Sequence, residues 1–186
     1  MTMAPGLRKL ALTVHVTSSV GWIGAAASFV ALTAAGLTSR DARMVRAVYL
    51  AAEPITWYAI VPLALAALLT GLVMSLGTPW GLFRHYWVLI TLVLTILSTV
   101  VLLQYTQTVS YFAGVAVATD SADPGGLPSY LLHSGVGLLV LLVITVLNVY
   151  KPRGVTPYGR RKQREERALL QPQHAPSQPP HARARP

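Results

Sequence analysis

Residues 85–119 read HYWVLITLVLTILSTVVLLQYTQTVSYFAGVAVAT and contain no Lys, Arg, Asp or Glu. A charged group in hydrocarbon is heavily penalised, and about 20 apolar residues, each rising about 1.5 Å, cover the core of a bilayer. Three further windows are equally free of charge, at residues 10–39, 54–83 and 124–150. We therefore predict a polytopic membrane protein with four spans.

The composition of the whole chain supports this class. Hydrophobic residues make up 53% of the chain and charged residues 11%, whereas soluble domains are about 25% charged. A surface facing water would lack the polar groups to cover it, so the bilayer is the expected solvent. The chain has no cysteine, which excludes disulfides, thiolate nucleophiles and metal sites built from cysteine.

The expected fold is an all-α bundle of four transmembrane helices in residues 1–150. A cleaved signal peptide is an alternative for the first window, because Arg8 and Lys9 precede it and the alanines at 25–27 offer a cleavage site. The apolar stretch continues beyond the roughly 7–15 residues of a cleaved segment, which favours an uncleaved span. We place the spans at about residues 10–37, 54–77, 85–112 and 129–150.

The second span is preceded by a basic segment. Arg40, Arg43 and Arg46 recur there at three-residue spacing among apolar neighbours, which predicts an interfacial helix or a helical extension of the span. Pro54 suits a first helical turn, whereas Pro62 lies inside the span and is expected to kink it.

Basic residues are spread unevenly over the segments between the spans. Twelve Lys and Arg lie on the side that holds both termini, against three in the loop after the first span and none in the loop after the third. Lys and Arg accumulate on the cytoplasmic side of membrane proteins. We therefore expect a plasma-membrane protein with its N- and C-termini in the cytoplasm.

The segment after the fourth span, residues 151–186, is a basic, Pro-rich tail with a net charge of +7. A basic side chain near anionic lipid contributes about 1 kcal/mol, so residues 151–167 are expected to contact the inner leaflet, unless they serve only as a solvated stop-transfer signal. The tail is expected to be disordered, above all in residues 171–186, which are rich in Pro, Gln and Ala. Nothing in it predicts specific binding of nucleic acid.

Three histidines, His15, His133 and His85, are the candidate cofactor-binding residues. A polar group at membrane depth is a functional hypothesis by default. For His15 and His133 the structural alternative is an interhelical hydrogen bond, since each shares a helical face with residues that suit close helix packing. His85 lies between Trp80 and Trp87, and its alternative is an aromatic belt at the membrane edge.

Other residues within the windows have structural interpretations. Glu53, at the outer edge of the second span, is expected to cap a helix N-terminus or to face solvent. Gly21, Gly24, Gly135 and Gly137 lie inside spans and predict close helix packing. No carboxylate pair lies at membrane depth and no internal repeat is found, which disfavours an ion pump and a secondary transporter.

A two-histidine site for haem b or a metal is the sharpest redox hypothesis, because an apolar four-helix bundle is a natural container for one. At about 1.5 Å per residue, His15 lies roughly 9 Å and His133 roughly 27 Å from the cytoplasmic edge. A gap of roughly 18 Å is too long for one iron, so two one-histidine sites, or the pair His15 and His85, are the remaining geometries. No residue is assigned a catalytic role, and no metal-ligand set is predicted.

The spacing His15-x6-Trp22-x-Gly24 resembles the first span of bacterial copper-resistance-D-like membrane proteins, and similar patterns occur in the four-span protoporphyrinogen oxidase family. The oxidase resemblance implies a functional lysine within the spans, and this chain has none there. The copper resemblance implies Met, His or Cys at the outer face, whereas Met74, the methionine inside a predicted span, lies near its cytoplasmic end.

A broader resemblance covers most of residues 7–162. TPWGLFRHYW at 78–87, LLHSGVGLL at 131–139 and NVYKPRGVTPYGRR at 148–161 are similar to a group of uncharacterised four-span bacterial integral membrane proteins. This resemblance implies a helical bundle in the plasma membrane and no established activity.

Three functions stay open. The first is a non-enzymatic membrane component that serves as an assembly partner of another membrane protein. The second is a haem- or metal-binding redox protein, and the third is a small-molecule permease. In each case the lipid bilayer is an expected partner, with anionic lipid at the basic segment.

Overall fold

The structure is a computed structural model that describes residues 3–77, 82–118 and 126–170, and these residues form a succession of helices. No strand occurs in these residues, where a single isolated bridge joins His85 to Val155. The prediction of an all-α fold is confirmed. The elements are α1 (Pro5–Thr38), α2 (Ala42–Ile55), the π-helical turn η1 (Thr56–Ile60), α3 (Val61–Gly77), α4 (Tyr86–Ala118), α5 (Leu127–Tyr150) and α6 (Pro157–Leu170).

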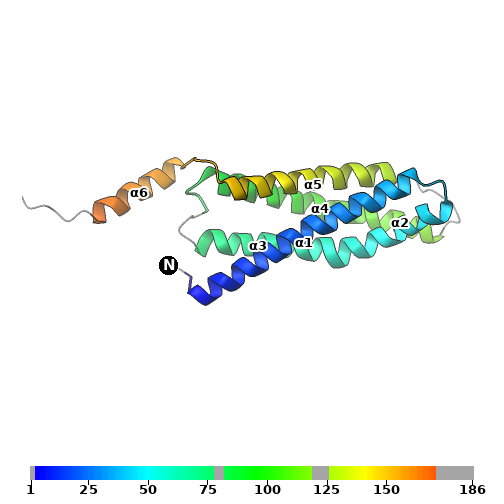
Figure 1. Cartoon of the computed structure of the whole chain (residues 1–186), viewed down its shortest axis with the longest axis horizontal. Coiled ribbons are helices and arrows are strands. Elements are labelled where there is room, and N and C mark those ends of the chain that lie inside the picture. The colour runs from blue at the N-terminus through cyan, green and yellow to red at the C-terminus, as the bar shows by residue number, and fades with distance from the viewer. Residues whose placement is uncertain (1–2, 78–81, 119–125, 171–186) are drawn as a thin grey trace, which may run out of the picture.

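Four long rods form the bundle, and each is long and apolar enough to cross a membrane (Figure 1). They are α1, the continuous helix from Ala42 to Gly77, α4 and α5, with 34, 36, 33 and 24 residues. At about 1.5 Å per residue the three longest measure about 50 Å, more than the roughly 30 Å of the hydrocarbon core. These helices therefore tilt in the bilayer or extend beyond it.

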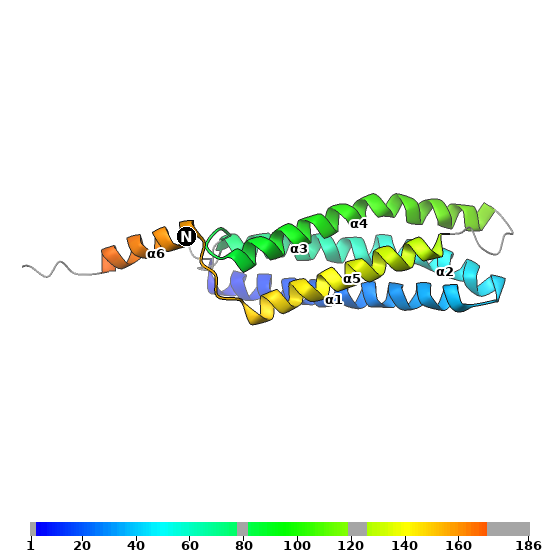
Figure 2. The same cartoon turned by 90° about the horizontal axis from the view of Figure 1, so that it is seen from above.

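The two ends of the bundle carry different parts of the chain. At the end called here the terminal end, the Met3 N–H donates to the Gly77 oxygen over 3.5 Å, and His85 pairs with Val155. The N-terminus and α6 both lie at this end in Figures 1 and 2. At the opposite end, called here the loop end, α1 ends and α2 begins, α4 ends at Ala118 and α5 begins at Leu127.

The basic segment before the second span is a helical extension of that span. The Asp41 side chain accepts a hydrogen bond from the Arg43 N–H over 2.9 Å and caps the helix, so α2 begins at Ala42. Pro54 therefore lies inside α2, and the prediction that it begins a helix is wrong. Glu53 is likewise inside the helix, so it caps no N-terminus.

The turn η1 joins α2 to α3 between two prolines, Pro54 and Pro62. The Val61 N–H donates to the Thr56 oxygen, five residues back, and the rod continues. A proline lacks an N–H and leaves a carbonyl four residues earlier without its helical donor, which a π-helical turn accommodates.

Aromatic side chains fill the loop end. Tyr130 is fully buried, with ring centroids 5.8 Å from Phe29, 5.6 Å from Tyr49, 6.0 Å from Phe112 and 6.1 Å from Tyr105. We call these five residues the aromatic cluster. Because they come from α1, α2, α4 and α5, the cluster holds all four rods together.

The tail begins with a docked segment rather than a disordered one. The Tyr86 N–H donates to the Gly154 oxygen over 3.2 Å and the Thr156 N–H to the Arg84 oxygen over 3.0 Å, while the Thr156 hydroxyl donates to the Phe83 oxygen. We call residues 154–159 the C-terminal latch. It is followed by α6, so the predicted disorder is wrong for residues 157–170, and residues 171–186 lie outside the described chain.

Local chemistry explains why α6 starts at Pro157. The Thr156 side-chain oxygen accepts from the Gly159 N–H over 3.0 Å, which is an N-cap, and Pro157 fits the first helical position. A Cβ at Gly159 would overlap the Arg84 oxygen, so only glycine fits there. An ion pair between Arg84 and Glu166 also ties α6 to the bundle.

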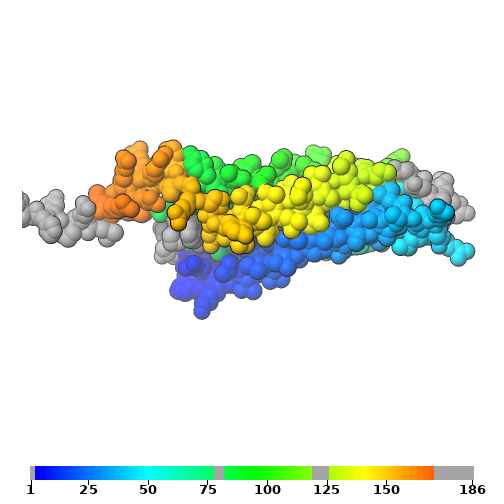
Figure 3. All heavy atoms as spheres, turned by 45° about the horizontal axis from the view of Figure 1, so that its top comes forward, coloured from blue at the N-terminus to red at the C-terminus, as the bar shows by residue number. Residues whose placement is uncertain are grey.

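Beyond the latch, α6 continues away from the terminal end, roughly along the long axis of the bundle (Figures 1 and 2). The space-filling view in Figure 3 shows α1 and α5 against each other along one face, with α6 projecting past them. Lys151 and Arg153, of the basic segment 151–167, lie between the end of α5 and the latch, whereas α6 points away from the bundle.

Candidate functional site

His15 forms an interhelical hydrogen bond. Its Nδ1 lies 3.1 Å from the Ala67 oxygen and 3.0 Å from Thr70 Oγ1, both on α3. A carbonyl oxygen only accepts, so Nδ1 is the donor in the bond to Ala67. The packing role expected as the alternative for His15 is therefore present in the structure.

The imidazole of His15 fits because Gly71 faces it. A Cβ at Gly71 would lie 3.1 Å from Cε1 of His15, tighter than most contacts of a real side chain. This pairing was not predictable, since the two residues are far apart in the chain and a single glycine in a span has many explanations.

His133 belongs to a different part of the bundle. Its ring stacks on Tyr105 of α4, with centroids 3.9 Å apart and planes inclined by 13°, and its Nδ1 lies 2.9 Å from the Ser129 oxygen of its own helix. The Tyr105 hydroxyl lies 2.8 Å from Ser129 Oγ. His133 therefore contacts the neighbouring helix by stacking rather than by the expected interhelical hydrogen bond.

His85 lies just before α4, in the bridge with Val155, and its ring centroid is 6.5 Å from that of Trp87. It thus adjoins the C-terminal latch. Trp80, the other aromatic residue of the predicted belt, lies outside the described residues. The structure places His85 at the edge of the bundle, as the belt interpretation requires.

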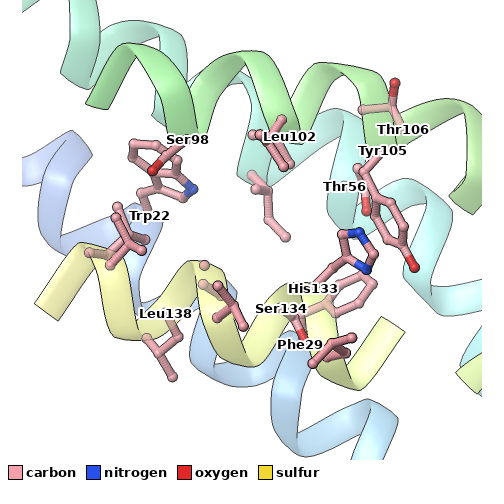
Figure 4. Close-up of a pocket in the computed structure, with 18 of the residues that line it drawn as sticks. Trp22, Phe29, Thr56, Ser98, Leu102, Tyr105, Thr106, His133, Ser134 and Leu138 are labelled. Atoms are coloured by element: carbon pink, nitrogen blue, oxygen red, sulfur yellow. The ribbon is translucent and has the colours of Figure 1, made fainter. Parts of the chain in front are cut away.

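A first cavity of about 480 Å³, called here the outer cavity, lies between α1, η1, α4 and α5. Figure 4 shows Tyr105 and His133 facing each other at one end of it and Trp22 beside Ser98 at the other. Most of its other lining is apolar, including Ile60, Leu97, Val101, Leu102, Leu138 and Val140.

A second cavity of about 620 Å³, called here the inner cavity, lies toward the terminal end between α1, α3, α4 and α5. Its polar lining residues include His15, Ser19, Thr91, Thr95 and Asn148, and Arg8 and Lys151 lie at its rim. The two cavities share two lining residues, Trp22 and Leu141, which are both buried and separate them.

No two of the three candidate histidines line the same cavity. His133 lines the outer cavity, His15 lines the inner one and His85 lines neither. Among residues 3–77, 82–118 and 126–170, no group of three or more His, Cys, Asp or Glu side chains could hold a metal ion. The arrangement offers two mainly apolar cavities and one cationic rim rather than a convergent ligand set.

Arg8 and Lys151 are the site residues that sequence reasoning missed. Arg8 was counted only as a topology signal, and Lys151 only as part of the basic segment expected to contact lipid. In a four-helix bundle the start of the first span and the end of the fourth lie at the same end, and that is the signal from which their place beside one cavity was predictable.

Comparisons of the chain with protein-family models, with curated proteins and with solved structures find no match. The resemblances drawn from the His-Trp-Gly spacing and from residues 7–162 therefore stay predictions.

Proposed function

We propose that the chain is a non-enzymatic component of the plasma membrane that works as an assembly partner of another protein, with both termini in the cytoplasm. The observation that carries the proposal is the separation of the three histidines. Each is engaged by its own surroundings: His15 by α3, His133 by Tyr105 and His85 by the latch region.

This separation weighs against the redox alternative. A haem held by two histidines needs both imidazoles to reach one iron from opposite faces within a single cavity. His15 and His133 line different cavities, with Trp22 and Leu141 between. The cytoplasmic placement of both termini is supported by the twelve Lys and Arg on the side of the bundle that holds them.

The part of the molecule that suits a partner is α6. Its base is fixed by the latch and by the ion pair from Arg84 to Glu166, so it projects from the bundle in a defined direction. Most of its exposed charged side chains are basic, and opposite charge steers association. An acidic cytoplasmic surface is the partner this helix fits. The basic side chains concerned are Arg160, Arg161, Arg164 and Arg167.

Purification of the full chain from its native membrane in mild detergent tests the proposal. We expect a second protein in constant ratio, lost in Arg164→Glu and retained in the control Arg43→Glu, which changes the same charge at the loop end. Absence of any partner, or a Soret absorption band that His15→Ala abolishes, contradicts it.

A small-molecule permease is the second candidate, because the two cavities follow each other along the bundle and share Trp22 and Leu141. Uptake of a labelled short-chain fatty acid by proteoliposomes tests it. A permease requires uptake above that of empty liposomes and a changed rate in Trp22→Ala, whereas equal uptake excludes this substrate.

A further inference from the structure

We propose that the inner cavity binds one anionic phospholipid, with the headgroup phosphate at Arg8 and Lys151 and an acyl chain inside. The two side chains are far apart in the sequence but lie at the same end of the bundle. Arg8 is in the first turn of α1, and Lys151 directly follows α5. Both are exposed and both line the cavity. The chain thus presents two cations at one membrane edge beside an interior space.

The charge of the cavity is of one sign. Among its described lining residues there are two cations and no carboxylate. Lys and Arg donate strong hydrogen bonds to phosphate oxygens, and a cation at the membrane surface is attracted to anionic lipid. The rim therefore selects an anion.

The interior of the cavity suits an apolar chain, because most of its hydroxyl and amide groups already donate to carbonyls of their own helices. The hydroxyls of Thr91 and Thr95 donate to carbonyls of α4 over 3.1 and 2.7 Å, and the Asn148 amide donates to the Ile144 oxygen over 2.8 Å. Satisfied groups need no ligand of their own. Most of the remaining lining is apolar, including Leu12, Val16, Val20, Ile23, Leu68 and Leu92.

The backbone at Lys151 supports a role for its side chain. With φ 45° it is the non-glycine residue of the described chain in the left-handed region, at the C-terminal end of α5. Helices that end this way usually carry glycine there, because a Cβ is disfavoured. A lysine at this position places a cation beside the rim of the cavity, although glycine would adopt this left-handed conformation with less strain.

An anion at this rim has two sources, a lipid headgroup or free phosphate. The volume of about 620 Å³ and the apolar lining favour the lipid, since a free phosphate would use only the rim. The assignment to the inner leaflet rests on the proposed cytoplasmic termini, whereas the binding itself does not. Binding in detergent can therefore fail or succeed independently of the sidedness and of any protein partner.

The experiment is titration of the delipidated full chain with phosphatidylglycerol or phosphatidylcholine, read by native mass spectrometry. We expect one phosphatidylglycerol per chain, bound more tightly than phosphatidylcholine. Removal of one charge is expected to weaken binding about fivefold, both in Arg8→Gln and in Lys151→Gly. Lys151→Gly also relieves the left-handed strain, so a purely structural lysine would leave binding and folding intact.

Two controls separate the site from general attraction. Arg153→Gln removes a cation of the same segment that does not line the cavity, and it is expected to bind phosphatidylglycerol like the unaltered chain. Ser19→Leu fills part of the cavity, keeps both cations and is expected to weaken binding. Equal affinity for the two lipids, an equal loss in Arg153→Gln, or displacement of the lipid by inorganic phosphate overturns the proposal.

Discussion

The loop end and the terminal end of the bundle are built in opposite ways. At the loop end, Tyr49 and Tyr130 are 0% exposed, and their hydroxyls are hydrogen-bonded across elements. At the terminal end a cavity of about 620 Å³ lies between the helices, with Arg8 and Lys151 at its rim. The loop end thus holds the buried aromatic rings, of which Phe29 and Tyr105 also line the outer cavity, whereas the cavity with the cationic rim lies at the terminal end.

The contrast extends to the way each end is closed. The Tyr49 hydroxyl accepts from the N–H groups of Gly126 and Leu127, over 2.8 and 3.0 Å, and so satisfies the start of α5. The terminal end is closed by the latch, in which the buried Thr156 hydrogen-bonds to the backbone oxygens of Phe83 and Arg84. Substitutions at the two ends should therefore have different consequences.

The largest effect is expected in the aromatic cluster. Tyr49→Ala removes a fully buried ring that packs against Phe112 and Tyr130, and should lower the free energy of unfolding by about 3–5 kcal/mol. Tyr49→Phe leaves two N–H groups without an acceptor and should cost about 1–3 kcal/mol. Thermal unfolding in detergent measures both. Tyr58→Ala, at a ring that is 86% exposed, is the matched control, and an equal loss there contradicts the comparison.

The next effect is local to the latch. Thr156→Val removes the N-cap of α6 and the hydroxyl that donates to the Phe83 oxygen, and should destabilise the docked segment by about 1–2 kcal/mol. Hydrogen exchange should rise in residues 154–170 and stay unchanged in the aromatic cluster. Thr13→Val, which loses a hydroxyl bonded within its own helix, serves as control. Faster hydrogen exchange at the loop end of Thr156→Val would contradict this prediction, because a change at the terminal end would then destabilise the loop end as well.

A smaller effect is expected at His15. His15→Ala removes the hydrogen bond to the Ala67 oxygen, and such interhelical bonds in membranes contribute about 0.6–1.7 kcal/mol. The unfolding midpoint should fall slightly, and less than in Tyr49→Phe. His85→Ala, whose ring lines neither cavity, should change the midpoint less. A loss of stability as large as that in Tyr49→Ala would contradict the comparison, because the terminal end would then contribute as much to stability as the loop end.

The smallest effect is the pH response of α6. Hydrogen bonds from Lys162 and Arg161 lower the pKa of Glu165 from its ordinary value of 4.5. Because the folded pKa is the lower one, these pairs stabilise α6 above pH 4.5, and their contribution is lost as pH falls through the lowered pKa. A spin label at Ala168→Cys should become more mobile over that range. The added change Glu165→Gln should abolish the response, and a response that persists there contradicts the assignment.

The sequence was sufficient for the spans but not for the contacts between them. Charges in hydrocarbon are so unfavourable that four uncharged windows alone predict the four rods. Which glycines pack was not predictable. Gly21 faces Leu63, as close packing requires, but a Cβ at Gly24, Gly135 or Gly137 would meet nothing within 4 Å. Composition shows that a small residue is present and not what faces it.

The latch shows a second limit. The latch hydrogen-bonds to the backbone oxygens of Phe83 and Arg84. Every residue has such an oxygen, so the residue types do not predict the contact. The pair Thr156-Pro157 was nevertheless a readable helix start, which the prediction of a disordered tail did not take into account. The inner cavity was not predictable either. Like the packing of the glycines, it depends on contacts between helices, here on which side chains leave space between α1, α3, α4 and α5.

The most direct test of the account is the compartment that each end of the bundle faces. The chain has no cysteine, so Ala42→Cys at the loop end and Ala168→Cys on α6, both at exposed positions, each provide a single reactive thiol. With an impermeant maleimide on intact cells, we expect labelling of the Ala42 variant, and of the Ala168 variant only after the membrane is permeabilised. The reverse pattern contradicts the cytoplasmic termini, and labelling of both variants in intact cells contradicts a bundle whose two ends lie on opposite sides of the membrane.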